Sequence, residues 1–190
     1  MTVKKLLRMG DQRLLEKSIT VQNIDSPEVQ QLIDDLWESQ DFYGGAGIAA
    51  PQIGSFQRVV VFGFKAHARY PHEKPIADTV LINPEIEVLD DALEEDWEGC
   101  LSVPLYRGLV PRYKKIGYRG YDRDGQLFER EAAGFHARLV QHECDHLDGV
   151  LFPMRIKDLR NFGCEDLLWQ RMNTEAYPEE YQEALPESWK

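Results

Sequence analysis

Two histidines one helical turn apart restrict this chain more than any other feature of its sequence. Between residues 132 and 147, one helical face carries Phe135, Leu139, His142 and His146, because side chains three and four positions apart share a side of a helix. The two apolar side chains direct this face toward the interior, where an imidazole without a partner costs free energy. The fold must therefore surround this helix and give both imidazoles a partner.

The residues between the two histidines indicate that this partner is a metal ion. The sequence reads His-Glu-Cys-Asp-His over residues 142–146, and two histidines at this spacing can reach one ion. Glu143, beside the first histidine, is placed to take a proton from water at the ion. A chance match on a polar helix is the alternative, and the apolar residues on the same face argue against it.

A catalytic metal site needs a third protein ligand and one position left open for water. The candidates are Cys100 upstream of the histidines, and Asp148, Glu165 and Asp166 downstream. Cys144 is a poor candidate, because it lies two residues from each histidine and projects away from them on a helix. We interpret Cys144 and Cys164 as structural thiols.

Length and composition favour one globular domain in the cytoplasm. The chain has 190 residues, of which 43% are hydrophobic, and this length suits a single core. The sequence contains no run of about 18 apolar residues, the length that would predict a membrane span. The charged N-terminus does not fit a signal peptide. Three cysteines at irregular spacing do not indicate a disulfide framework. The formal net charge of −11 argues against a general nucleic-acid binder, which needs a basic face.

The other segments alternate between helical and extended patterns. Ser26 and Pro27 match the start of a helix, which should run to about Phe42. We expect strands at 58–64, 79–82, 111–121 and 126–131, a loop at 67–78, a turn at 122–125, a helix at 132–147 and a short helix from about 165. This order predicts an α+β fold of mostly antiparallel sheets around a central helix that carries the two histidines. Residues 1–173 should form one domain, followed by an acidic C-terminal tail at 174–190.

Two upstream segments carry little information when each is taken alone. Residues 98–102 read Glu-Gly-Cys-Leu-Ser, and a buried structural cysteine would explain Cys100 there. Residues 45–52 read Gly-Ala-Gly-Ile-Ala-Ala-Pro-Gln. They follow a helix, and no lysine comes after them, so neither a dinucleotide-binding fingerprint nor a P-loop is credible.

Taken together, the three segments resemble the signature motifs of the peptide deformylase family. Those motifs are Gly-x-Gly-x-Ala-Ala-x-Gln, Glu-Gly-Cys-Leu-Ser and Gln-His-Glu-x-Asp-His, and every fixed position is filled at residues 45–52, 98–102 and 141–146. The similarity covers roughly Val3 to Phe152. It implies a metal-dependent hydrolase that removes the formyl group from the N-terminal formylmethionine of newly synthesised polypeptides and releases formate.

The resemblance implies the ligand set and the metal. Cys100 would be the third ligand, with His142 and His146. A thiolate and two imidazoles suit a tetrahedral site with one open position, and ligand type alone favours zinc. The resemblance implies Fe(II) instead, and Zn, Ni or Co ions could occupy the same ligands.

The resemblance also assigns roles around the metal. Glu143 would act as general base and then as acid, while the Gln52 amide and the Leu101 backbone N–H would stabilise the oxyanion. The residues expected to contact substrate are Ala46, Gly47, Gly99, Arg107, Phe135 and Leu139. Core packing explains Phe135 and Leu139 nearly as well, and an exposed basic side chain is the simpler reading of Arg107. We expect Glu98 and Asp145 to orient the loop and the imidazole.

The expected partners are N-formylmethionyl nascent peptides and, transiently, the ribosome, with no membrane and no specific nucleic acid. A basic stretch is the candidate ribosome contact, and its alternative interpretation is simply the exposed face of a hairpin: Arg107, Arg112, Lys114, Lys115, Arg119 and Arg123. One alternative is a His-Glu-x-x-His peptidase, which takes its third ligand downstream of the helix. Another is a non-catalytic metal-binding module with four closed ligands, in which Glu143 would have no use.

Overall fold

The computed structural model describes residues 3–66 and 72–172. The helices are α1 (Pro27–Tyr43), α2 (Phe135–Leu147) and α3 (Glu165–Met172), with short 3-10 turns η1 (Gln12–Leu15), η2 (Ala50–Ile53), η3 (Phe152–Arg155) and η4 (Leu159–Asn161). The strands are β1 (Gly47–Ala49), β2 (Val59–Phe64), β3 (Ile76–Cys100), β4 (Val103–Tyr121), β5 (Leu127–Ala133) and β6 (Phe162–Cys164). All strand pairs are antiparallel, in the order β1-β2-β3-β4-β5 with β6 beside β4. The predicted α+β class is confirmed.

Local sequence explains how α1 begins and ends. The Ser26 side chain accepts a bond from the Val29 N–H, and Pro27 occupies the first turn, where its missing N–H has no cost. Gly44 then ends the helix with φ 63°, a left-handed conformation that glycine adopts without strain. This turn directs the chain into β1, which carries the first signature segment toward α2.

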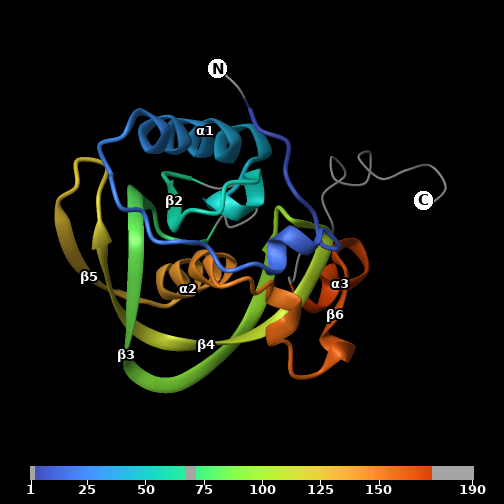
Figure 1. Ribbon diagram of the computed structural model, residues 1–190. Coiled ribbons are helices and arrows are strands. Elements are labelled where there is room, and N and C mark those ends of the chain that lie inside the picture. Colours follow the sequence, from blue (N-terminus) through green and yellow to red (C-terminus); the bar gives the residue numbers. More distant parts are fainter. Residues whose placement is uncertain (1–2, 67–71, 173–190) are drawn as a thin grey trace.

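The strand β2 is buried on both faces. Val60 and Phe62 pack in a core cluster with α2, whereas Val59 and Val61 pack in a second cluster with α1. Figure 1 shows β2 between these two helices. Because both faces exclude water, the strand is a continuous apolar run without polar alternation.

The strands β3 and β4 form one long curved ribbon that passes along α2 (Figure 1). The middle section of β3, residues 85–96, is exposed. At one end Cys100 pairs with Val103, so residues 101–102 form a tight turn beside the cysteine. The ribbon therefore holds Cys100 at a fixed hairpin end, facing α2.

Several expected boundaries were wrong. The strands expected at 79–82 and 111–121 are parts of the longer β3 and β4. Of the loop expected at 67–78, residues 76–78 belong to β3 and residues 67–71 lie outside the described residues. The helix expected from residue 132 begins only at Phe135, because β5 continues through Ala133. Among the helices described, none is long and apolar enough to cross a membrane. The acidic tail at 174–190 lies outside the described residues.

Candidate metal centre and active-site pocket

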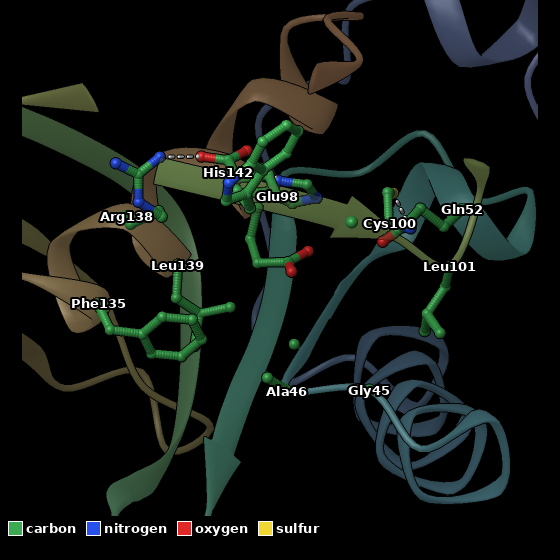
Figure 2. A pocket seen from close by; sticks show the side chains of 14 residues that line it. Gly45, Ala46, Gln52, Glu98, Cys100, Leu101, Phe135, Arg138, Leu139 and His142 are labelled. Carbon is green, nitrogen blue, oxygen red and sulfur yellow. Dashed lines mark hydrogen bonds and ion pairs between the residues drawn. The ribbon is translucent and has the colours of Figure 1, made fainter. Parts of the chain in front are cut away.

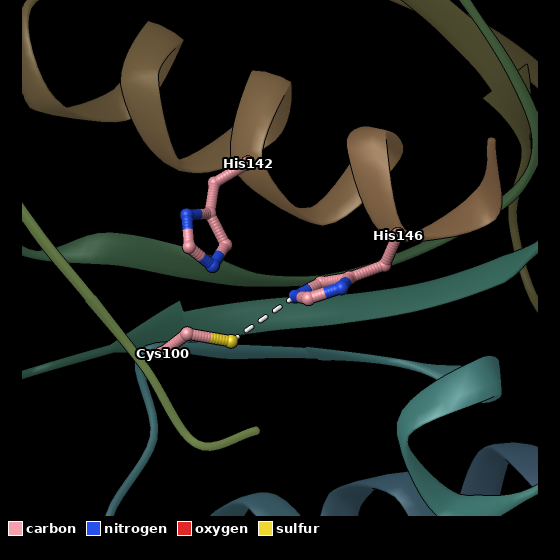
Figure 3. Close-up of side chains that lie close together, drawn as sticks. All are labelled: Cys100, His142 and His146. Carbon is pink, nitrogen blue, oxygen red and sulfur yellow. Dashed lines mark hydrogen bonds between the residues drawn. The ribbon is translucent and has the colours of Figure 1, made fainter. Parts of the chain in front are cut away.

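The side chains of Cys100, His142 and His146 form a buried cluster. Their ligand atoms all lie within 4.8 Å of one another, and α2 directs both imidazoles toward the cysteine at the end of β3 (Figure 3). The Cys100 Sγ is 3.3 Å from His146 Nε2, close to the separation of about 3.5 Å between ligand atoms of a tetrahedral zinc site. One thiol and two imidazoles in this arrangement fit a transition-metal ion.

Two of the alternative third ligands are engaged elsewhere. Asp148 forms an ion pair with Arg58 at 2.8 Å, and Glu165 forms one with Arg107 at 2.6 Å. Cys144 is buried in the core cluster along α2, where burial raises the pKa of its thiol. A thiol in this state remains protonated, which agrees with its interpretation as a packing residue.

Glu98 fixes the orientation of His142. Its Oε2 lies 2.8 Å from His142 Nδ1, so Nε2 is the ring nitrogen directed at the cluster (Figure 3). Burial alone would raise the pKa of Glu98, but the Arg112 guanidinium and His142 hold that pKa below its ordinary value. The carboxylate is thus ionised and accepts a hydrogen bond from the Nδ1–H of the imidazole. Burial also holds the pKa of His146 well below its usual range, so that imidazole is neutral and has a lone pair for an ion.

Glu143 presents an unused carboxylate oxygen at this cluster. The side chain is buried, and within residues 3–66 and 72–172 its Oε2 has no hydrogen-bond partner. A Cβ at Gly47 would lie 2.7 Å from Glu143 Oε1, so glycine is required for the β1 backbone to pass this close. Burial raises the pKa of Glu143 to about 7. A carboxyl group with that pKa can gain and lose a proton near neutral pH.

The Gln52 amide is locked with its nitrogen toward the cysteine. Its Oε1 accepts a bond of 2.8 Å from the Ala49 N–H, which decides which end of the amide is the oxygen. Its Nε2 donates to Ser102 Oγ at 3.1 Å and lies 3.5 Å from Cys100 Sγ. Gln52 therefore brings a rigid N–H donor to the cluster.

A pocket opens beside these groups and has an apolar wall. Phe135 and Leu139 lie together on one side of it, and Ala46 lies on the side of β1 (Figure 2). The lining also includes Gly45, Gly47, Gln52, Trp97, Glu98, Gly99, Cys100, Leu101, Arg138, His142 and Glu143. This arrangement can receive an apolar side chain and place the attached polar group at the cluster. The structure thus brings together every predicted site residue except Arg107.

Arg107 is not an exposed basic side chain, which was the simpler of its two interpretations. It is 3% exposed, and its guanidinium binds Glu165 at the start of α3. A Cβ at Gly99 would lie 2.5 Å from Arg107 Nη1. Arg107 therefore packs behind the Gly99 backbone, next to Cys100.

The predicted basic stretch is not a basic surface either. Arg107 and Arg112 are buried, and five of the six side chains form ion pairs. These pairs are Arg107–Glu165, Arg112–Glu98, Lys115–Glu131, Arg119–Glu85 and Arg123–Asp34. Paired charges of this kind offer little attraction to a polyanion.

Two arginines near the cluster were not assigned to the site from the sequence. Arg112 donates to both oxygens of Glu98, at 2.8 and 2.9 Å, and Arg138 donates to one of them at 2.9 Å. One signal could have identified Arg138. It lies four residues before His142, on a helical face whose other members are apolar or histidine.

Comparison with known proteins assigns the chain to a family. A family model described as polypeptide deformylase matches residues 3–162. The chain belongs to the peptide deformylase family. The resemblance expected for residues 3–152 is thus confirmed, and the match extends ten residues further.

Curated relatives match over nearly the whole peptide deformylase sequence. Peptide deformylase 1 of Bordetella pertussis is 52% identical over 174 residues, which is 92% of this chain and 99% of the relative. Peptide deformylase 2 of Ralstonia nicotianae is 51% identical over 170 residues, which is 90% of this chain and 96% of the relative.

Solved peptide deformylase structures share the fold. The class I type b enzyme of Acinetobacter baumannii with Met-Ala-Ser bound is 34% identical, with a TM-score of 0.76 over 82% of this chain and 99% of that one. The Synechococcus elongatus enzyme in complex with actinonin is also 34% identical, with a TM-score of 0.73 over 83% of this chain and 81% of that one.

Proposed function

We propose that this protein removes the formyl group from N-formylmethionyl nascent peptides and releases formate. The observation that carries the proposal is the buried carboxylate of Glu143 beside the Cys100, His142 and His146 cluster, at the end of an apolar pocket. A metal-dependent hydrolase needs a base beside its metal ligands. Membership of the peptide deformylase family supports formylated nascent peptides as the substrate.

Cys100, His142 and His146 are the residues that would hold the metal ion, and α2 would be the central helix of the catalytic domain. A bound ion supplies Lewis-acid activation of water and of the formyl carbonyl. We propose Fe(II) on the strength of the family, and Zn(II), Ni(II) or Co(II) suit the same ligands. We further propose that residues 1–173 act as one catalytic domain.

Glu143 would move the proton during the reaction. Its free oxygen takes a proton from the attacking water, and the carboxyl group then gives it to the leaving amine. The pKa of about 7 suits both steps, because a base and an acid work best with a pKa near the working pH.

The substrate would lie between β1 and the turn after β3. The methionine side chain enters the wall formed by Phe135, Leu139 and Ala46, while the peptide backbone passes Gly47 and Gly99. Arg107 would support Gly99 from behind, since its guanidinium is already bound by Glu165.

We keep a transient encounter with the ribosome as part of the proposal, because nascent peptides emerge there. The ion pairs of Lys115, Arg119 and Arg123 make a charge-driven anchor on this part of the chain weak. The peptide itself would then provide the specific contact.

Release of formate from formyl-Met-Ala-Ser tests the function, with protein purified anaerobically and loaded with iron. We expect turnover with the formylated peptide and no cleavage of internal peptide bonds. Cleavage within an unformylated peptide would instead support the His-Glu-x-x-His peptidase. Binding of metal without either activity would support the non-catalytic module.

Replacement of Gln52 by leucine should lower kcat by about 10²–10³ while leaving bound metal unchanged, because it removes one oxyanion donor. The assay is formate release, together with metal analysis. Gln30→Leu is the control, since Gln30 binds the backbone of Ile24 and Arg123, away from the pocket. Equal losses in the two variants would contradict the assigned role.

A further inference from the structure

A row of charged side chains leads from His142 to the surface of the protein. Its first member, Glu98, receives four hydrogen bonds. Oε1 accepts from Arg112 Nε and Arg138 Nη1, and Oε2 accepts from Arg112 Nη2 and His142 Nδ1, at 2.8–2.9 Å. A carboxylate has about four acceptor positions, so this one cannot turn without breaking a bond. Its orientation therefore depends on where Arg112 is held.

Arg112 is held from its other side by Asp145. The Arg112 Nη1 donates to Asp145 Oδ2 at 2.5 Å, while Nε and Nη2 bind Glu98. The guanidinium is planar and has its donors in a fixed fork. Two carboxylates thus determine its position together, one at each edge of the plane.

Asp145 is itself fixed by a charge at the surface. Arg155 of η3 donates to both of its oxygens, at 3.0 and 2.6 Å. The Arg155 side chain is 48% exposed, whereas that of Asp145 is 11% exposed. The row therefore reaches from His142 to the surface through Glu98, Arg112, Asp145 and Arg155.

Neither carboxylate oxygen of Asp145 binds a ligand imidazole in the part of the chain described. We infer that Asp145 is a positioning residue for the metal ligand His142, and that it acts through Arg112 and Glu98. Without its charge, Arg112 and Arg138 are two buried cations that share the single carboxylate of Glu98. Arg112 then shifts, and the acceptor for His142 Nδ1 shifts with it. The inference rests on the proposed metal site and not on the chemistry performed there.

Asp145→Asn tests this with a readout that needs no substrate. We expect zinc to leave the loaded variant for a chelator about 10–100 times faster than it leaves the wild type, as when a partner behind a ligand is removed. Asp148→Asn is the matched control. Asp148 lies three residues further along and is ion-paired with Arg58, but its side chain is 49% exposed and it is not part of the row. The two variants losing zinc at the same rate would overturn the inference.

A second pair of variants tests the route through Arg112. Arg112→Lys keeps the charge but lacks the rigid planar fork that holds both carboxylates in place. It should therefore also speed zinc loss, and adding Asp145→Asn to it should have little further effect. If the two substitutions instead multiplied each other's effect on the rate of zinc loss, Asp145 would act by another route. In the zinc-loaded protein, the NMR resonance of the His142 Nδ1 proton should shift in Asp145→Asn and not in Asp148→Asn. An unchanged resonance contradicts the inference, whatever the thermal stability of the variant.

Discussion

Glu143→Gln should keep its metal and lose nearly all deformylase activity. The amide has the size of the carboxylate it replaces, and Glu143 is outside the three-residue ligand cluster. An amide cannot accept the proton of the attacking water, so kcat should fall by about 10²–10⁴. Formate release measures the loss, and metal analysis of the same sample shows whether the cluster is intact.

This result separates a base from a structural residue. Glu143 has a buried oxygen without a partner within the described residues, so its replacement by an amide breaks no existing ion pair. The melting temperature should therefore remain near that of the wild type. A variant that keeps metal and more than about a tenth of the wild-type rate would show that another group moves the proton.

Cys100→Ala should lose both metal and activity. If about 10–16 kcal/mol of zinc affinity is shared among four ligands, one ligand accounts for roughly 3 kcal/mol, or about 10²–10³ in affinity. Metal retained after dialysis against a chelator is the measurement. Cys100→Asp provides a substitute oxygen ligand and should still bind zinc, with altered activity.

Cys144→Ala is the control for this experiment. The two thiols are both buried, yet Cys144 belongs to the core cluster and Cys100 to the ligand cluster. Removing the Cys144 thiol should cost some stability through lost packing and leave the metal content unchanged. Equal metal loss in both variants would show that the wrong thiol was assigned.

The sequence predicts the elements whose burial follows a simple period. Helix α2 and strand β2 were both expected, at 132–147 and 58–64, because their apolar residues share a face or form a continuous run. The full length of β3 was not predictable in this way. Its residues 85–96 are mostly exposed and acidic, so neither an alternating nor a continuous apolar pattern marks them as a strand.

Sequence reasoning failed where a buried charge depends on a distant partner. Arg107 is neutralised by Glu165, which is 58 positions away, and Arg138 by Glu98, which is 40 positions away. Composition places isolated arginines at the surface, because burying them without a partner is too costly. Only the fold reveals which carboxylate pairs with each arginine, although the helical face shared with His142 marks Arg138 as a candidate. By contrast, the three metal ligands could be predicted, because they lie in the signature segments.

The burial of α2 has a consequence for how this sequence can change over generations. Every residue from Ala137 to Leu147 is buried, so the helix has no solvent-facing side on which neutral substitutions could accumulate. Most changes there would leave a void, a steric clash or an unpaired charge. The exposed residues 85–96 of β3 are under no such restriction. A saturation library selected for growth should therefore show a nearly invariant helix beside a permissive middle section of β3.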